Sequence, residues 1–189
     1  MSRYTALFDA NILYPAPMRD LLMQLALTDL FKAKWTREIH EEWISALLEN
    51  RSDLSREQLE RTRDAMDSHV RDALIEGYDT ITDSLTLPDA DDRHVLAAAI
   101  IGRCDVIITQ NEKDFPEDVV APFGIEVQHP DAFLANLLAL APGVFCEAVR
   151  TVRARLNNPS YSAERYLTIL ASQGLVVTAA ELEQFSALI

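Results

Sequence analysis

The segment 105–109, Asp-Val-Ile-Ile-Thr, is the feature that most constrains how this chain can fold. Its continuous β-branched residues are typical of a central parallel strand that is buried on both faces. Residues 4–8 and 124–128 have a similar apolar character, and helical patterns separate the three segments. The sequence therefore predicts an α/β fold, a three-layer α/β/α sandwich around a mainly parallel sheet.

The C-terminal part of the chain has a different pattern. No strand is predicted after residue 131, and four helices are expected at about 131–141, 144–156, 162–173 and 179–189. The last helix is expected to open with a capping box formed by Thr178 and Glu181. We therefore predict an α/β domain over residues 1–135 and a small all-helical C-terminal extension over residues 136–189.

Charge and composition limit the classes of function. Seventeen Lys and Arg residues face thirty Asp and Glu residues, which gives a formal net charge of −13. Such a protein does not bind nucleic acid through bulk electrostatics. The excess of acidic residues can instead serve solubility, the binding of a basic partner or the binding of a cation. No apolar run is long enough to span a membrane, and the N-terminus has no signal-peptide pattern. We expect a soluble, cytoplasmic protein that has no membrane partner.

Polar residues follow the first and the central strand. Asp9 ends the first strand, where it can serve either as a turn residue or as a site residue. Thr109, Asn111 and Asp114 follow the central strand. Because ligands of parallel sheets bind beyond the carboxyl ends of the strands, we expect these side chains to lie near one another.

Two further groups of carboxylates lie on predicted helices. Glu42 lies beside the apolar stripe of a helix that Thr36 caps, where a metal could partner it. The alternative is that Glu42 extends to solvent or pairs with Arg37 or Lys34. Asp89, Asp91 and Asp92 open the helix that ends at Gly102. A helix N-terminus accounts for one or two of these charges, and a divalent cation would relieve the repulsion of the third.

The order and spacing of these motifs resemble the PIN-domain family, including the VapC toxins of bacterial toxin–antitoxin pairs. The resemblance covers about residues 4–133 and consists of Phe-Asp-Ala-Asn at 8–11, a Glu about thirty residues later, Asp-Asp before Val-Leu-Ala-Ala-Ala, and Ile-Ile-Thr-x-Asn-x-x-Asp-Phe at 107–115. It implies a Mg²⁺-dependent endoribonuclease, with Mn²⁺ as a substitute, that hydrolyses structured RNA such as tRNA or rRNA.

The resemblance also implies a role for individual residues. The catalytic and metal-binding residues would be Asp9, Glu42, Asp92 and Asp114, around one or two ions. Supporting polar residues would be Asn11, Thr109, Asn111 and Asp91. Contacts to RNA would come from Arg37, Arg93 and Lys113, for which surface salt bridges are the alternative use. The four histidines show no ligand spacing and are expected to be structural or surface residues.

The partners implied are RNA, a small cognate antitoxin protein and a second copy of the chain in a homodimer. The negative net charge favours an antitoxin with a basic segment, and the association of the two proteins should weaken as the salt concentration rises. Two alternatives stay open. One is a catalytically silent PIN module that binds RNA or a partner. The other is a haloacid-dehalogenase-like phosphatase, which normally needs a second Asp where this chain has Asn11.

Overall fold

The computed structural model describes residues 4–157 and 159–189. The chain passes three times between two structural units. The sheet unit contains residues 4–14 and 31–129, and the helical unit contains Pro15–Leu30 and Pro130–Ile189. The expected domain boundary at residue 135 therefore differs from this division, which falls at 129/130 and assigns residues 15–30 to the helical unit.

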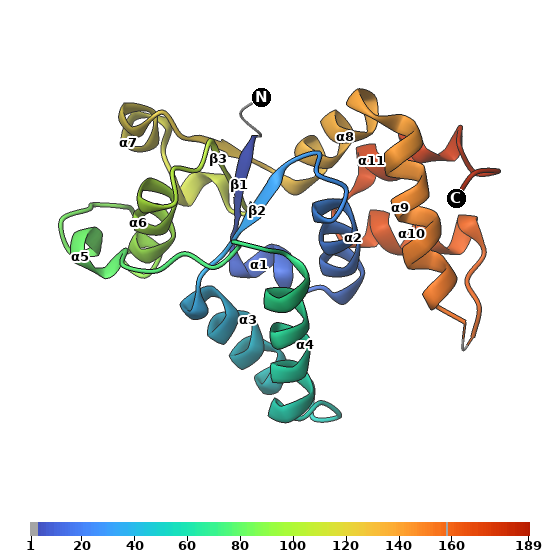
Figure 1. Ribbon diagram of the computed structural model, residues 1–189, viewed down its shortest axis with the longest axis horizontal. Helices are drawn as coiled ribbons and strands as arrows, with labels where there is room; N and C mark the ends of the chain where they lie inside the picture. Colours follow the sequence, from blue (N-terminus) through green and yellow to red (C-terminus); the bar gives the residue numbers. More distant parts are fainter. Residues whose placement is uncertain (1–3, 158) are drawn as a thin grey trace. The chain divides into compact units, whose positions relative to one another are not determined.

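A four-stranded sheet forms the centre of the sheet unit (Figure 1). Its strands are β1 (Thr5–Phe8), β2 (Lys32–Lys34), β3 (Val106–Ile108) and β4 (Glu126–Gln128), in the order β2-β1-β3-β4. All three pairings are parallel, and Leu7 aligns with Lys34 on one side and with Ile107 on the other. The β-branched run is fully buried, as expected for a central strand. The predicted α/β architecture with a parallel sheet is confirmed.

Helices flank this sheet. They are α1 (Ala10–Leu13), α3 (Arg37–Asn50), α4 (Arg56–His69), α5 (Asp79–Thr82), α6 (Arg93–Ile101) and α7 (Glu117–Val120), with 3₁₀ turns η1 (Glu112–Asp114) and η2 (Ala121–Phe123). Thr36 caps α3 by accepting a hydrogen bond from the Ile39 amide, 3.1 Å away. The N-terminus of α4 carries the complete capping box of Ser55 and Gln58. A Cβ at position 102 would press on the end of the Ile75 side chain, which would have to shift to make room for it.

A buried hydrogen-bond network connects α3 to α4. Trp43 Nε1 donates to His40 Nδ1 (3.0 Å), so the His40 proton lies on Nε2 and is donated to Asp67 Oδ1 (3.1 Å). Trp35 Nε1 donates to the same Asp67 oxygen at 2.8 Å. Burial lowers the pKa of His40, despite the opposing effect of Asp67, and favours the neutral ring that this network needs.

Substitution of Asp67 by alanine is expected to lower the free energy of unfolding by about 2–4 kcal/mol, because it leaves two buried N–H donors without an acceptor. Asp67→Asn keeps an acceptor oxygen and should cost less than half as much. Denaturant unfolding followed by tryptophan fluorescence measures both, since Trp35 and Trp43 are the two tryptophans of the chain. Equal losses in the two variants would contradict this assignment.

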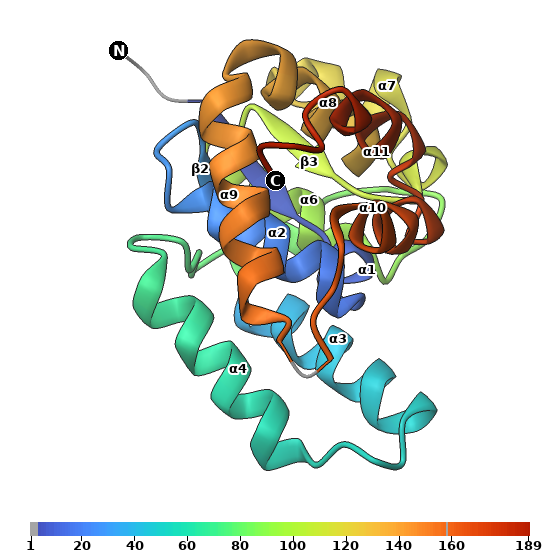
Figure 2. The same ribbon diagram turned by 90° about the vertical axis from the view of Figure 1, so that its right-hand side faces the viewer.

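The helical unit consists of α2 (Ala16–Ala26), α8 (Pro130–Leu140), α9 (Pro142–Arg155), α10 (Ala163–Ser172) and α11 (Val176–Glu183). α2 packs against α9 and α10, while α11 packs against α8 and α10 (Figure 2). These contacts explain why residues 15–30 belong to the helical unit: the apolar face of α2, with Leu21, Leu22 and Leu25, is buried there. Local sequence shows that such a face exists, but it does not show which helices cover it.

The start of α11 differs from the prediction. The helix begins at Val176, three residues earlier than expected, and Thr178 lies buried inside its first turn. The predicted Thr178–Glu181 capping box is therefore wrong. Asp131 of α8 replaces it, because its carboxylate accepts hydrogen bonds from the amides of Val177 and Thr178, both 2.8 Å away.

Of the helices described, none is by itself long and apolar enough to cross a membrane; α8 and α9 meet those criteria only as a pair, with a 120° bend at their junction.

Candidate metal centre

Asp9 lies at the carboxyl end of β1, where the chain turns into α1. Its amide continues the sheet by donating to the Ile108 carbonyl of β3 (3.1 Å). Its side chain caps α1 and is almost fully buried. Three donors hold its carboxylate: the Ala10 amide at 2.6 Å, Asn11 Nδ2 at 2.6 Å and the Thr109 hydroxyl at 2.7 Å. Asp9 thus has one defined orientation.

Asn11 and Thr109 join the ends of β1 and β3. Asn11 Nδ2 donates to the Thr109 hydroxyl oxygen at 2.8 Å as well as to Asp9, and its Oδ1 accepts the Gln110 amide at 3.0 Å. The Thr109 hydroxyl oxygen in turn accepts the Asn111 amide, 3.0 Å away. The structure therefore brings four of the residues singled out from the sequence (Asp9, Asn11, Thr109 and Asn111) into one network at the carboxyl edge of the sheet.

Several carboxylates gather at this edge. Burial raises the pKa of Asp92 to about 6, and repulsion from Asp9 and Asp114 adds to the effect, as do smaller contributions from Asp89 and Glu42. Burial is also the main cause of a raised pKa at Asp9, where the Thr109 and Ala10 hydrogen bonds oppose it and Glu42 adds repulsion. The folded chain therefore holds carboxylates that repel one another in a partly buried place.

A histidine partners Glu42. His94 of α6 is buried, and its Nε2 lies 2.7 Å from Glu42 Oε1 of α3. Its Nδ1 lies 3.5 Å from Glu38 Oε2, and the Tyr78 hydroxyl donates to that same Glu38 oxygen at 3.2 Å. Burial disfavours the charged ring, but the Glu42 hydrogen bond and the nearby carboxylates outweigh burial and raise the pKa of His94. Glu42 thus has a close histidine partner on the side of the cluster that α3 contributes, and the raised pKa of His94 favours its charged form.

The donor set suits a hard divalent cation. Among the described residues, no three Asp, Glu, His or Cys side chains converge into a closed metal cage. Mg²⁺ does not require one, because it keeps several waters and is often held by one or two carboxylates together with substrate phosphate. Asp9, Asp92 and Asp114 offer only oxygen ligands, and burial, together with repulsion from Asp9 and Asp114, raises the pKa of Asp92. These residues fit such an ion.

Family comparisons agree with this geometry. Residues 5–113, more than half of the chain, match the family model described as the PIN domain. The chain belongs to the PIN-domain family. Residues 130–184 match a second family model, the VapC50 C-terminal domain. The chain is thus a VapC-like PIN protein with a helical C-terminal region, as the motif order had predicted.

A curated relative matches over a short stretch. The protein named "Putative ribonuclease VapC50" from Mycobacterium tuberculosis (strain ATCC 25618 / H37Rv) is 53% identical over 49 residues, which are 26% of this chain and 29% of that protein. The match thus spans less than a third of the relative's length. No solved structure matches the chain.

The two adjacent aspartates of the PIN domain differ in their surroundings. Asp92 is half-buried and interacts with Asp9 and Asp114, whereas Asp91 is exposed. Asp89 does not cap α6: its Oδ1 accepts the Asp91 amide at 2.9 Å, in the turn before the helix. The geometry thus favours Asp92 over Asp91 as the residue that belongs to the carboxylate cluster.

The basic residues predicted near the site make ordinary contacts. Arg93 Nε donates to the Ala90 carbonyl at 2.8 Å, and exposed Arg37 lies 3.9 Å from Glu76. Lys113 is exposed on η1. A role for these residues in RNA binding stays a prediction.

Sequence reasoning did not place His94 and Glu38 at the site. His94 carries no ligand spacing, and its partner Glu42 is 52 residues away in the chain. One local signal was available: Glu38 and Glu42 are four residues apart and therefore share a helix face, which calls for a cationic neighbour.

Proposed function

We propose that this PIN domain is a divalent-metal-dependent endoribonuclease that uses Mg²⁺, with Mn²⁺ as a substitute, to hydrolyse phosphodiester bonds in structured RNA. The observation that carries the proposal is the group formed by Asp9, Asp92 and Asp114 at the carboxyl edge of a parallel sheet. The name of the VapC50 relative, which includes the word ribonuclease, supports the same reaction class.

The chain's own residues would divide the work. Asp9, fixed by Asn11 and Thr109, would hold a metal ligand in one orientation. Asp92 and Asp114 would complete the oxygen donor set, and Glu42 would stay in place through its bond to His94. A bound divalent ion would supply an activated water and stabilise the charge that develops on the phosphoryl oxygens.

We also propose that the protein is the toxin of a toxin–antitoxin pair and that a small antitoxin protein binds it. The family membership and the VapC50 C-terminal region support this role. The net charge of −13 suits an antitoxin with a basic segment, since opposite charge accelerates association.

The test is cleavage of total cellular RNA by purified protein with Mg²⁺, with Mn²⁺ and with EDTA. We expect discrete RNA fragments with either metal and none with EDTA. Cleavage that persists in EDTA would point to a contaminating nuclease and contradict the proposal. A folded, antitoxin-free protein that cleaves no RNA would favour the silent binding module, and turnover of a phosphomonoester such as p-nitrophenyl phosphate would favour a phosphatase.

A further inference from the structure

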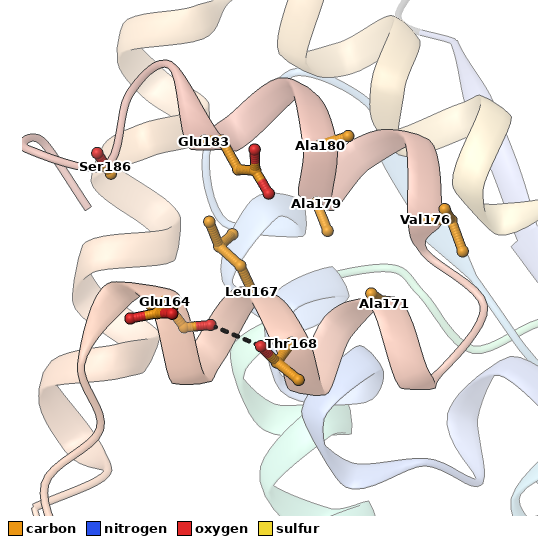
Figure 3. A pocket seen from close by; sticks show the side chains of 9 residues that line it. All are labelled: Glu164, Leu167, Thr168, Ala171, Val176, Ala179, Ala180, Glu183 and Ser186. Atoms are coloured by element: carbon orange, nitrogen blue, oxygen red, sulfur yellow. Dashed lines mark hydrogen bonds between the residues drawn. The ribbon is translucent and has the colours of Figure 1, made fainter.

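A groove of about 630 Å³ lies between α10 and α11 of the helical unit (Figure 3). The lining residues have the same spacing on both helices, with Ser186 just beyond α11: positions 164, 167, 168 and 171 of α10 and positions 176, 179, 180 and 183 of α11. Each set follows the i, i+3, i+4, i+7 pattern of a single helix face. A volume of this size lies within the range of small-molecule sites.

The two ends of the groove differ chemically. α10 and α11 are joined by the short turn at Gln173–Leu175 and run in opposite directions, so the start of α10 lies beside the end of α11. Glu164 and Glu183 thus form an acidic end, while Ala171 and Val176 form an apolar end near the turn (Figure 3).

The apolar end is open to solvent. Val176 is 60% exposed, and small side chains such as Ala180 leave space beside it. Buried Leu167 and Ala179 form the floor of the groove. An exposed apolar hollow with a polar rim is characteristic of interaction sites on soluble proteins.

The acidic end lacks a partner within the described part of the chain. Neither carboxylate, that of Glu164 or that of Glu183, forms an ion pair or hydrogen bond with another described residue, although the Glu164 carbonyl accepts the Thr168 hydroxyl. Many other exposed glutamates of the chain do have partners, such as Glu57 with Arg61 and Glu147 with Arg150. Two unpaired carboxylates beside an apolar hollow call for a ligand that combines apolar and cationic groups.

We propose that this groove binds an amphipathic helix of a partner protein, with apolar side chains at its apolar end and a Lys or Arg at its acidic end. Glu164 and Ala171 are seven positions apart, which is about 10 Å along the helix, so the cation should follow the first apolar side chain by about two helical turns. The groove then binds its partner by helix-in-groove recognition. The spacing of the partner's apolar side chains sets the register, and its charged side chain sets the orientation of the helix. This surface lies outside the carboxylate cluster, and the inference does not depend on the nuclease proposal.

Other occupants suit the groove less well. A second copy of this chain carries thirteen excess negative charges, which oppose binding at an acidic end. RNA phosphates would be repelled by Glu164 and Glu183 for the same reason. A neutral apolar molecule would leave both carboxylates unused.

Binding of two labelled, helix-forming peptides to the full chain tests the proposal by fluorescence anisotropy at low and high salt. The first has leucines at positions i, i+3 and i+4 and lysine at i+7, and the second has glutamate in place of that lysine. We expect the lysine peptide to bind about tenfold more tightly, with a difference that shrinks as salt rises. The double variant Glu164→Gln/Glu183→Gln should remove most of the difference, whereas the control Glu49→Gln, at an exposed position of α3, should retain it.

The variant Ala180→Trp gives a second test. A large side chain at this exposed position should fill the groove and abolish binding of both peptides. Circular dichroism should show that the variant stays folded. Equal binding of the two peptides, no binding of either, or unchanged binding by Ala180→Trp would overturn the proposal. Sedimentation as a dimer that Ala180→Trp converts to a monomer would also overturn it and assign the groove to self-association.

Discussion

Replacing Asp92 by asparagine is expected to reduce metal-dependent RNA cleavage by about 10²- to 10³-fold, whereas the same change at Asp91 should leave the rate nearly unaltered. The two positions are adjacent, and each variant loses one negative charge while keeping its shape. Of the two, only Asp92 is half-buried, and burial, with added repulsion from Asp9 and Asp114, raises its pKa to about 6. Asp91 therefore serves as a matched control for the general effect of lost charge.

Initial rates of cleavage over a Mg²⁺ titration measure this prediction, with circular dichroism as the test of folding. A loss at Asp91 that equals the loss at Asp92 would show that the geometry of the cluster has been misassigned. Activity that survives in both variants would remove Asp92 from the catalytic residues and favour the silent binding module.

The same substitution has a predicted effect on stability. The folded-state pKa of Asp92 lies above the usual value for aspartate, so folding disfavours its ionised form near neutral pH. The free energy of unfolding should therefore rise as the pH falls through about 6 toward the lower pKa that Asp92 has in the unfolded chain. Asp92→Asn should have the same effect as this protonation, because it removes the negative charge. We therefore expect a higher melting temperature for Asp92→Asn than for the wild type in EDTA. Lost activity with gained stability would distinguish a site residue from a structural one.

Sequence alone predicted the sheet where strand composition is unambiguous. The run at 105–109 and the apolar segment that ends at Asp9 became the two central strands, because continuous β-branched or apolar residues suit burial on both faces. Strand β2, Lys-Ala-Lys, was not predicted. Lys32 is exposed, and only Ala33 is buried, so the three residues lack a strand signature and owe their conformation to pairing with β1.

The candidate site was also predictable in part: the residues at the strand ends were predicted, and the contacts between helices were not. Residues at strand ends were brought together by the topology of a parallel sheet, which places the Thr109 hydroxyl 2.7 Å from the Asp9 carboxylate across a separation of 100 residues. The His94–Glu42 pair was not predicted, because it depends on how α6 and α3 approach each other. Helix packing of this kind leaves little trace in local sequence patterns.

Asp131 illustrates the same limit in the helical unit, and its loss should strongly destabilise that unit. Its buried carboxylate receives the amides of Val177 and Thr178 and the Thr178 hydroxyl, the last at 2.7 Å. These donors open α11, so the carboxylate also benefits from the positive end of the helix dipole. The capping motif predicted within α11 was wrong because the acceptor comes from α8, 47 residues earlier in the chain.

Asp131→Ala is therefore expected to lower the free energy of unfolding by about 3–5 kcal/mol, since three donors, two of them buried, lose a charged acceptor. Thr178→Val removes only one of those donors and should cost about 1–2 kcal/mol. Far-UV circular dichroism is the measurement, because both tryptophans lie in the sheet unit and their fluorescence does not report on α11 directly. If Asp131→Ala costs no more than Thr178→Val, the carboxylate is not the main support of α11. If the larger loss is found, the groove between α10 and α11 depends on the same contact, and the lysine peptide should bind Asp131→Ala more weakly than it binds Thr178→Val.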